Sequence, residues 1–246
     1  MKEHHKVPEY RHLLACCYRD APPRGPRSND AGTDPAVKLL RQLVKDFPKV
    51  PDYRYELGET LARMSMPGPP LRADQERSLR QLEEAATLSG GLIDDYPNVA
   101  LYVVSHALVH DRLGELLEQM DQGEEAERHY RKAIGLEATL SRQHPEVAIF
   151  DLTLARIQRS LARVLTDKKD FKEARTLLEA SADRLEAMVK KAPQPDRVRV
   201  SLGRTERDLA DVLTQLGERD LAAKAQRRAD ELGPERKAGP FGPPPN

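Results

Sequence analysis

The pattern of apolar and polar positions along this chain of 246 residues predicts paired helices. Between residues 106 and 120, Leu108, Leu113, Leu116 and Leu117 stand at helical spacing, and a similar apolar stripe runs from 126 to 140 after a break at 121–123. Such steps place apolar side chains on one helix face. Two stripes across a short break predict two antiparallel helices, which must stack on copies of themselves to cover their outer faces.

The pattern repeats along the C-terminal half of the chain. Pro97, Pro145 and Pro193 recur every 48 residues, and Pro48 precedes Pro97 by 49. Equivalent positions after these prolines carry equivalent residues, which indicates an internal repeat. The matching columns are Leu154 and Leu202; Leu113, Leu161 and Leu209; Leu117, Leu165 and Leu213; and Ala126, Ala174 and Ala222.

These patterns predict an all-α, right-handed superhelical solenoid of about four and a half antiparallel helix pairs. The predicted helices span residues 36–47, 53–66, 71–96, 98–120, 123–143, 146–168, 171–191, 195–216 and 219–232. Gly90 and Gly91 fall inside one of them, where each glycine costs roughly 1 kcal/mol relative to alanine, so a bend or local fray is expected there.

The same pattern divides the chain into five segments. Residues 1–20 form a partial first repeat helix, 21–34 a flexible Pro/Gly loop, and 35–96 degenerate repeat helices. Three regular long repeats follow at 97–233, before a Pro-rich tail at 234–246 that is expected to be disordered.

Composition narrows the range of partners. Lys+Arg and Asp+Glu both number 40, so no net charge draws the chain to nucleic acid or to an anionic membrane. No stretch approaches the roughly 20 apolar residues that span a bilayer, and no signal peptide is recognisable. Cys16 and Cys17 are adjacent, which argues against a disulfide framework and for the cytoplasm.

The columns resemble the tetratricopeptide repeat. Leu113-Gly114, Leu117, Ala126, Tyr130 and Ala133 reproduce its spacing, and residues 161–178 and 209–234 follow it more loosely. The period is longer than the usual 34 residues and resembles the long repeat regions of some large bacterial proteins, including those attached to serine/threonine kinases. The resemblance implies a non-enzymatic scaffold or adaptor that binds a protein or peptide. The alternative is a separately encoded regulatory arm of a signalling system such as a serine/threonine kinase.

In tetratricopeptide arrays the first helix of each pair lines a concave groove, and the resemblance assigns charged residues to that surface. The groove should be acidic toward the middle of the chain and basic toward its C-terminus. The assigned residues are Asp111, Glu115 and Glu118; Arg156, Arg159 and Arg163; and Arg204, Arg207 and Asp211, with Leu108 beside the first group.

Two interpretations of these charges stay open. Asp111 and Glu115 could pair with Arg159 and Arg163, each exposed pair contributing only about 0.2–1 kcal/mol, and charged helix faces are usually just solvated. The other interpretation is a ligand site, for which we hypothesise that an acidic partner segment docks on Arg156, Arg159, Arg204 and Arg207.

Histidine and cysteine spacing offers two metal-site alternatives that the sequence does not favour. His106 and His110 stand four apart, but Ala107 occupies the position where a metalloprotease helix needs glutamate, so surface or groove histidines are expected. His12 and Cys16 share this spacing, although thiols more often pack as small apolar groups. No catalytic set and no cofactor motif is recognised.

The two ends of the array make opposite predictions. The final helix, 219–232, is polar and alanine-rich and can close a solenoid against water. At the other end, Tyr10, Leu13, Leu14 and Tyr18 have no preceding helix to cover them. Either an upstream portion has been lost or this edge pairs with another molecule, and we prefer a homodimer through the N-terminal edge.

Overall fold

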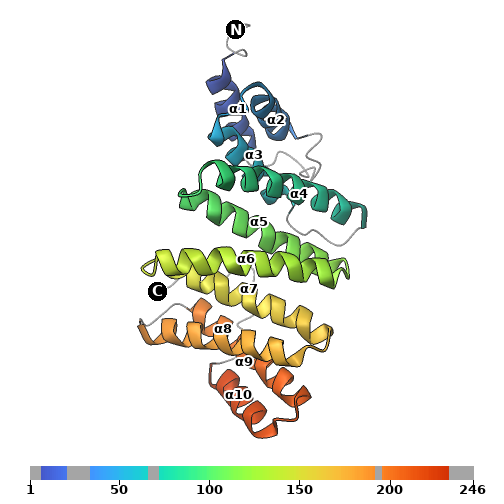
Figure 1. Cartoon of the computed structure of the whole chain (residues 1–246), viewed down its shortest axis with the longest axis vertical. Helices are drawn as coiled ribbons and strands as arrows, with labels where there is room; N and C mark the ends of the chain where they lie inside the picture. The colour runs from blue at the N-terminus through green and yellow to red at the C-terminus, as the bar shows by residue number, and fades with distance from the viewer. Residues whose placement is uncertain (1–6, 21–33, 66–71, 192–195, 233–246) are drawn as a thin grey trace, which may run out of the picture. The chain divides into compact units, whose positions relative to one another are not determined.

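The computed structural model describes residues 7–20, 34–65, 72–191 and 196–232 (Figure 1). Within these ranges the chain forms ten α-helices and no strand. They are α1 (Pro8–Asp20), α2 (Pro35–Asp46), α3 (Pro51–Met64), α4 (Arg72–Asp95), α5 (Ala100–Gln119), α6 (Gly123–Gln143), α7 (Ala148–Asp167), α8 (Phe171–Lys191), α9 (Asp196–Gln215) and α10 (Arg219–Glu231). The predicted loop at 21–34, apart from its last residue, and the predicted tail at 234–246 lie outside the described residues.

The helices pack as antiparallel pairs within two compact units. Unit 1, residues 1–143, contains the pairs α1/α2, α3/α4 and α5/α6, and unit 2, residues 144–246, contains α7/α8 and α9/α10. The helix boundaries agree with the predicted ones to within two residues. The described residues form five pairs, not four and a half, because α1 packs on α2 as a complete first pair. The division into segments predicted from sequence stays a prediction.

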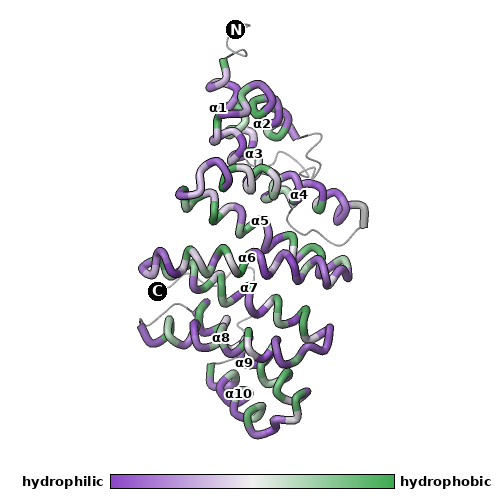
Figure 2. The backbone as a smooth tube through the Cα atoms, in the orientation of Figure 1, coloured by the Kyte–Doolittle hydropathy of each residue, from purple (hydrophilic) through white to green (hydrophobic). Residues whose placement is uncertain are grey.

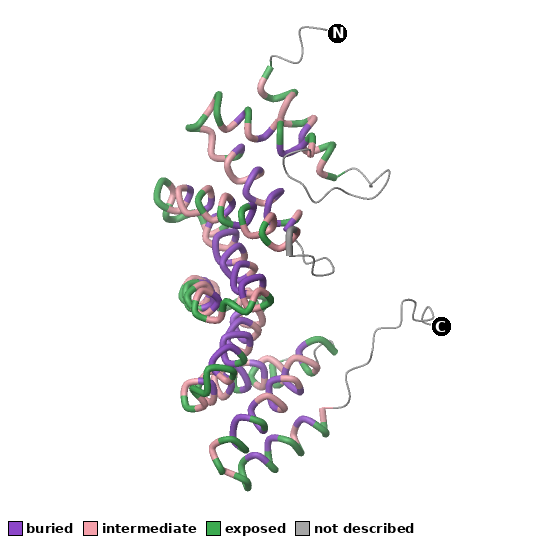
Figure 3. The backbone as a smooth tube through the Cα atoms, turned by 90° about the vertical axis from the view of Figure 1, so that its right-hand side faces the viewer, coloured by how far each residue is buried: buried purple, intermediate pink, exposed green. Residues whose placement is uncertain are grey.

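The repeat columns occupy equivalent buried positions. Leu113, Leu161 and Leu209 are 1%, 1% and 7% exposed, and the other leucine and alanine columns are buried to the same degree. Figure 2 shows apolar residues recurring among hydrophilic ones along the helices, and Figure 3 shows buried stretches alternating with exposed ones. The predicted repeat is therefore confirmed within the structure.

The turn between the two helices of a pair recurs with the same geometry. Asp121, Lys169 and Gly217 stand 48 residues apart and have positive φ angles of 58°, 63° and 79°. The next residue donates its backbone N–H to a carbonyl five residues back, as in Gln122 N–H to the Leu117 oxygen at 2.9 Å. This is the Schellman arrangement, in which a left-handed residue satisfies the last carbonyls of a helix.

The turn between successive pairs also repeats. The backbone N–H groups of Val50, Val99 and Val147 donate to the carbonyl three residues earlier, at 3.1, 3.2 and 3.0 Å. A proline follows each accepting residue, and its fixed φ favours the turn. Each valine then occupies the N-cap position of the next helix without a side-chain hydrogen bond.

One glycine allows close packing in unit 1. A Cβ added to Gly114 would lie 2.6 Å from the Tyr130 ring, so a larger residue would force the ring to shift where α5 and α6 approach. A Cβ at Gly90 would lie 3.5 Å from the His106 ring, which is an ordinary van der Waals distance. Helix α4 runs unbroken through Gly90 and Gly91, so the prediction of a local fray there is wrong. Packing of this helix against α5 outweighs the weak helix propensity of glycine.

Candidate partner-binding site

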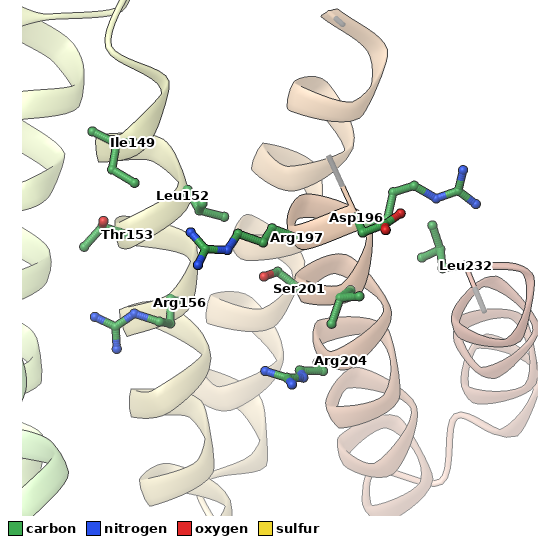
Figure 4. Close-up of a pocket in the computed structure, with 11 residues that line it drawn as sticks. Ile149, Leu152, Thr153, Arg156, Asp196, Arg197, Ser201, Arg204 and Leu232 are labelled. Atoms are coloured by element: carbon green, nitrogen blue, oxygen red, sulfur yellow. The ribbon is translucent and has the colours of Figure 1, made fainter. Parts of the chain in front are cut away.

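Unit 2 contains a cavity between the first halves of α7 and α9, with Leu232 at its edge (Figure 4). Its volume is about 690 Å³, which lies in the range of ligand sites in proteins. The lining residues are Ile149, Leu152, Thr153, Arg156, Asp196, Arg197, Arg199, Val200, Ser201, Arg204 and Leu232.

The charge of this cavity is predominantly positive. Four arginines line it, Arg156 from α7 and Arg197, Arg199 and Arg204 from α9, against the single carboxylate of Asp196. In Figure 4, Arg197 and Arg204 extend from α9 toward α7. Because the guanidinium group presents a planar fork of donors, this arrangement suits a carboxylate or phosphate.

The position of two arginines on α9 increases the preference for an anion. Arg197 and Arg199 lie in the first turn of the helix, where the positive end of the helix dipole opposes cations. Neither forms an ion pair with any residue in the described part of the chain. An anionic group bound there would interact favourably with both the side chains and the helix terminus.

The remaining wall of the cavity is apolar. Leu152 and Leu232 contribute apolar surface that also packs on the core of unit 2, while the Ile149 side chain is 57% exposed. Val200 completes this wall. The cavity therefore offers a hydrophobic surface next to a group of guanidinium donors, a combination that suits a peptide with both acidic and apolar side chains.

Two of the predicted partner-binding residues line this cavity and others have different surroundings. Arg156 and Arg204 line it together, whereas Arg159 Nη1 lies 3.6 Å from Asp208 Oδ2. Burial lowers the pKa of Arg159 and raises the pKa of Asp208, and the opposite charge of each partner partly offsets that effect. Arg163 is exposed and Arg207 half-buried, and neither lines the cavity.

Of the predicted acidic residues, Asp111, Glu115 and Glu118 belong to α5 in unit 1, and Asp211, which is exposed, belongs to α9. Asp111 is buried, at 2% exposure, and Glu115 is half-buried. Glu118 accepts a hydrogen bond of 2.8 Å from the hydroxyl of buried Tyr130, so it contributes to the packing of α5 on α6. The predicted pairing of Asp111 and Glu115 with arginines stays a prediction.

A chain of hydrogen-bonded histidines lies inside unit 1. Ser89 Oγ is 2.8 Å from His106 Nδ1, His106 Nε2 is 3.2 Å from His110 Nε2, and His110 Nδ1 is 2.8 Å from His129 Nδ1. The Ser89 hydroxyl donates to the Ala85 carbonyl, so it accepts from His106 Nδ1–H. Each neutral ring then donates once and accepts once along the chain, except that His129 only donates.

Burial keeps these histidines neutral. It lowers the pKa of His106 to about 4 and that of His110 to about 3, with the positive charge of Lys132 acting in the same direction on both. The pKa of His129 is also lowered, chiefly by burial. The prediction that His106 and His110 are surface or groove residues is wrong, because α4 and α6 supply partners that cover them.

No helix in the described ranges is long and apolar enough to cross a membrane. The sequence profile of the tetratricopeptide repeat matches residues 107–139, which cover most of α5 and α6. No curated protein matches the chain in sequence.

Several solved structures share the fold. A crystal structure of MamA protein has a TM-score of 0.54 at 14% identity, covering 96% of this chain and 100% of that chain. BtubC (BKLC) from P. vanneervenii has a TM-score of 0.53 at 18% identity, with coverages of 96% and 87%. A putative kinesin light chain with TPR-like repeats from Podosopora anserina has a TM-score of 0.50 at 19% identity, with coverages of 94% and 97%. The chain thus shares the fold of these proteins, and residues 107–139 match the tetratricopeptide repeat.

Proposed function

We propose that the chain is a non-enzymatic protein-interaction scaffold, and that unit 2 binds an acidic segment of a partner protein. The observation that carries the proposal is the cavity between α7 and α9, where four arginines adjoin an apolar wall. Helical repeats present extended surfaces of this kind for protein binding. The matched repeat and the shared fold are consistent with such a role.

The proposed ligand is an extended peptide in which carboxylates alternate with apolar side chains. The carboxylates would accept hydrogen bonds from Arg197 and Arg204, and the apolar side chains would cover Leu152 and Ile149. Arg156, 48 residues before Arg204 in the same repeat column, would bind the peptide from α7. Because guanidinium–carboxylate contacts are charge-assisted, binding should weaken as salt concentration rises.

The structure also identifies which arginines suit a charge-reversal experiment. Replacing Arg159 by glutamate would place two carboxylates side by side, since Arg159 lies beside Asp208, and that repulsion would disturb unit 2 itself. Arg197 is exposed, so its reversal changes the surface without burying a charge. Arg204 is half-buried and lines the cavity deeper along α9, so the pair Arg197→Glu with Arg204→Glu reverses the charge at two points of the same wall.

The test is a fluorescence-anisotropy titration with a labelled peptide of alternating glutamate and leucine residues. We expect saturable binding to the unmodified chain and a loss of affinity of about tenfold or more in the double variant. Arg227→Glu with Lys224→Glu, an equal charge change at two exposed positions of α10 outside the cavity, should bind like the unmodified chain. Equal affinity for all three proteins, with unchanged circular dichroism, would rule the site out.

A further inference from the structure

One face of α1 brings two potential metal ligands against α3. His12, Cys16 and Arg19 follow each other at steps of four and three, so they share a face of the helix. This face points at α3, because Arg19 forms an ion pair with Glu56 and the His12 ring meets the Tyr53 ring edge-on at 5.1 Å. The fold thereby adds Glu56 to the His12 and Cys16 pair visible in the sequence.

The three side chains are close enough to share one ion. One ligand atom from each of His12, Cys16 and Glu56 lies within 4.8 Å of the other two, and all three residues are half-buried. Ligand bonds to zinc of about 2.0–2.3 Å in a tetrahedron separate the ligand atoms by roughly 3.4–3.8 Å, so small side-chain rotations suffice. No other three histidine, cysteine or acidic residues in the described ranges meet this distance criterion.

A second observation points to a ligand at this position. The Nε2 atom of His12 is buried, and no described residue forms a hydrogen bond with it. A buried polar atom without a partner costs about 1–3 kcal/mol, and coordination would remove that cost. Glu56 can keep its ion pair with Arg19 through Oε2 and use its other carboxylate oxygen for the ion.

We propose that His12, Cys16 and Glu56 form a site for a zinc-like divalent cation that links α1 to α3. Imidazole and thiolate ligands favour zinc over magnesium or calcium, which prefer oxygen ligands alone. The three side chains supply three ligands and water the fourth. The Cys16 thiol loses its proton to solvent when the Zn–S bond forms, so affinity rises with pH.

The site should also support the outer edge of unit 1. Helix α1 is the end helix of this unit, and its contacts with α3 are side-chain contacts such as the Arg19–Glu56 ion pair. A cation bound by both helices would add a cross-link between them. Zinc should therefore slow amide exchange in α1, whatever partner unit 2 binds.

The test is titration of the metal-free full chain with Co²⁺, followed by competition with Zn²⁺. We expect one equivalent of Co²⁺ to produce a thiolate-to-cobalt charge-transfer band. Cys16→Ser should abolish the band and weaken zinc binding by about tenfold or more, whereas Cys17→Ser, which removes the adjacent exposed thiol, should change neither.

A His12→Gln variant provides a second measurement that does not depend on the cysteine. It should weaken zinc binding as strongly as Cys16→Ser while keeping the circular dichroism of the unmodified chain. The proposal is overturned if one-to-one zinc binding is missing, if the band survives in Cys16→Ser, or if His12→Gln binds zinc as tightly as the unmodified chain.

Discussion

At the scale of single residues, Gly114 and Tyr130 explain how α5 and α6 approach so closely. The Tyr130 ring is completely buried and its hydroxyl is held by Glu118, so the ring has little freedom to move. The space that a side chain at position 114 would need is occupied by that ring. At Gly135, on the exposed face of α6, an added Cβ would meet nothing within 4 Å.

These two glycines should respond oppositely to substitution by alanine. We expect Gly114→Ala to lower the free energy of unfolding by about 2 kcal/mol or more, because the new methyl group overlaps the Tyr130 ring. Gly135→Ala should raise it by about 0.5–1 kcal/mol through better helix propensity. Urea denaturation followed by circular dichroism measures both, and a Gly114→Ala variant as stable as the unmodified chain would contradict the packing described.

The histidine chain predicts a dependence of stability on pH. The folded-state pKa values of His106 and His110 lie below the ordinary value of 6.5, so the unfolded chain binds more protons once pH falls below about 7. The stabilisation that depends on the neutral histidines is thus fully present above the unfolded pKa. It is lost as pH falls toward the folded pKa values of about 4 and 3. Between pH 7.5 and 5.5 we expect a loss of about 1 kcal/mol per histidine.

The comparison that isolates this effect uses His110→Gln. Burial raises the pKa values of Asp208 and Glu206, and these carboxylates stabilise the folded state as pH falls, opposing the histidines. The variant keeps the contributions of the two carboxylates and of the other histidines, and it lacks only that of His110. The variant should therefore lose less stability than the unmodified chain between pH 7.5 and 5.5, and an equal loss would show that His110 stays accessible to protons.

The sequence predicted the buried positions that recur in every repeat. It did not predict the residues that join a cluster from a different helix. The leucine and alanine columns were predictable because every repeat buries the same positions. His129 and Glu56 were not, since each joins its cluster from another helix, 19 residues from His110 and 40 from Cys16. Arg197 was not predicted from the sequence, because the groove positions were counted from a leucine farther along the helix. The basic residues in the first turn of α9 were a signal that could have indicated an anion site.

At the scale of secondary-structure elements, the two recurring turns define the repeat. In the pairs α5/α6, α7/α8 and α9/α10 a residue with positive φ follows the first helix, and of these three residues only Gly217 is a glycine. A side chain in this conformation costs roughly 1–2 kcal/mol, so Lys169 and Asp121 carry strain that Gly217 avoids. The same turn therefore carries steric strain in the repeats with Asp121 and Lys169, and it carries none in the repeat with Gly217.

Relieving this strain should stabilise unit 2. We expect Lys169→Gly to raise the free energy of unfolding by about 0.5–1 kcal/mol, because glycine adopts φ 63° without steric cost. Lys168→Gly, at the neighbouring residue with φ −77°, should lower it by a similar amount. Thermal unfolding of both variants provides the measurement, and destabilisation by Lys169→Gly would argue against the left-handed turn.

At the scale of the whole molecule, the N-terminal helix leaves an apolar surface exposed. Tyr10, Leu13 and Tyr18 are 51%, 60% and 49% exposed, while His12 and Cys16 lie on the face turned to α3. The outer surface of α1 is therefore separate from the proposed cation site. Exposed apolar side chains gathered on one helix commonly mark a protein contact.

We expect this surface to pair with a second copy of the chain. Sedimentation velocity over micromolar concentrations should show a dimer, because isologous contact between two such faces covers both. Leu13→Glu should shift the equilibrium to monomer without changing the helix content, since Leu13 is exposed. A monomer at all concentrations for the unmodified chain would contradict this arrangement.

The central claim, that unit 2 receives an acidic peptide between α7 and α9, is tested most directly by amide hydrogen exchange with and without the glutamate–leucine peptide. First-turn amides have no partner within their own helix, so they exchange readily until a ligand covers them. We predict slower exchange at residues 196–199 of α9 and unchanged exchange in α10. Unchanged exchange at residues 196–199 with saturating peptide bound, or protection confined to other helices, would contradict the claim.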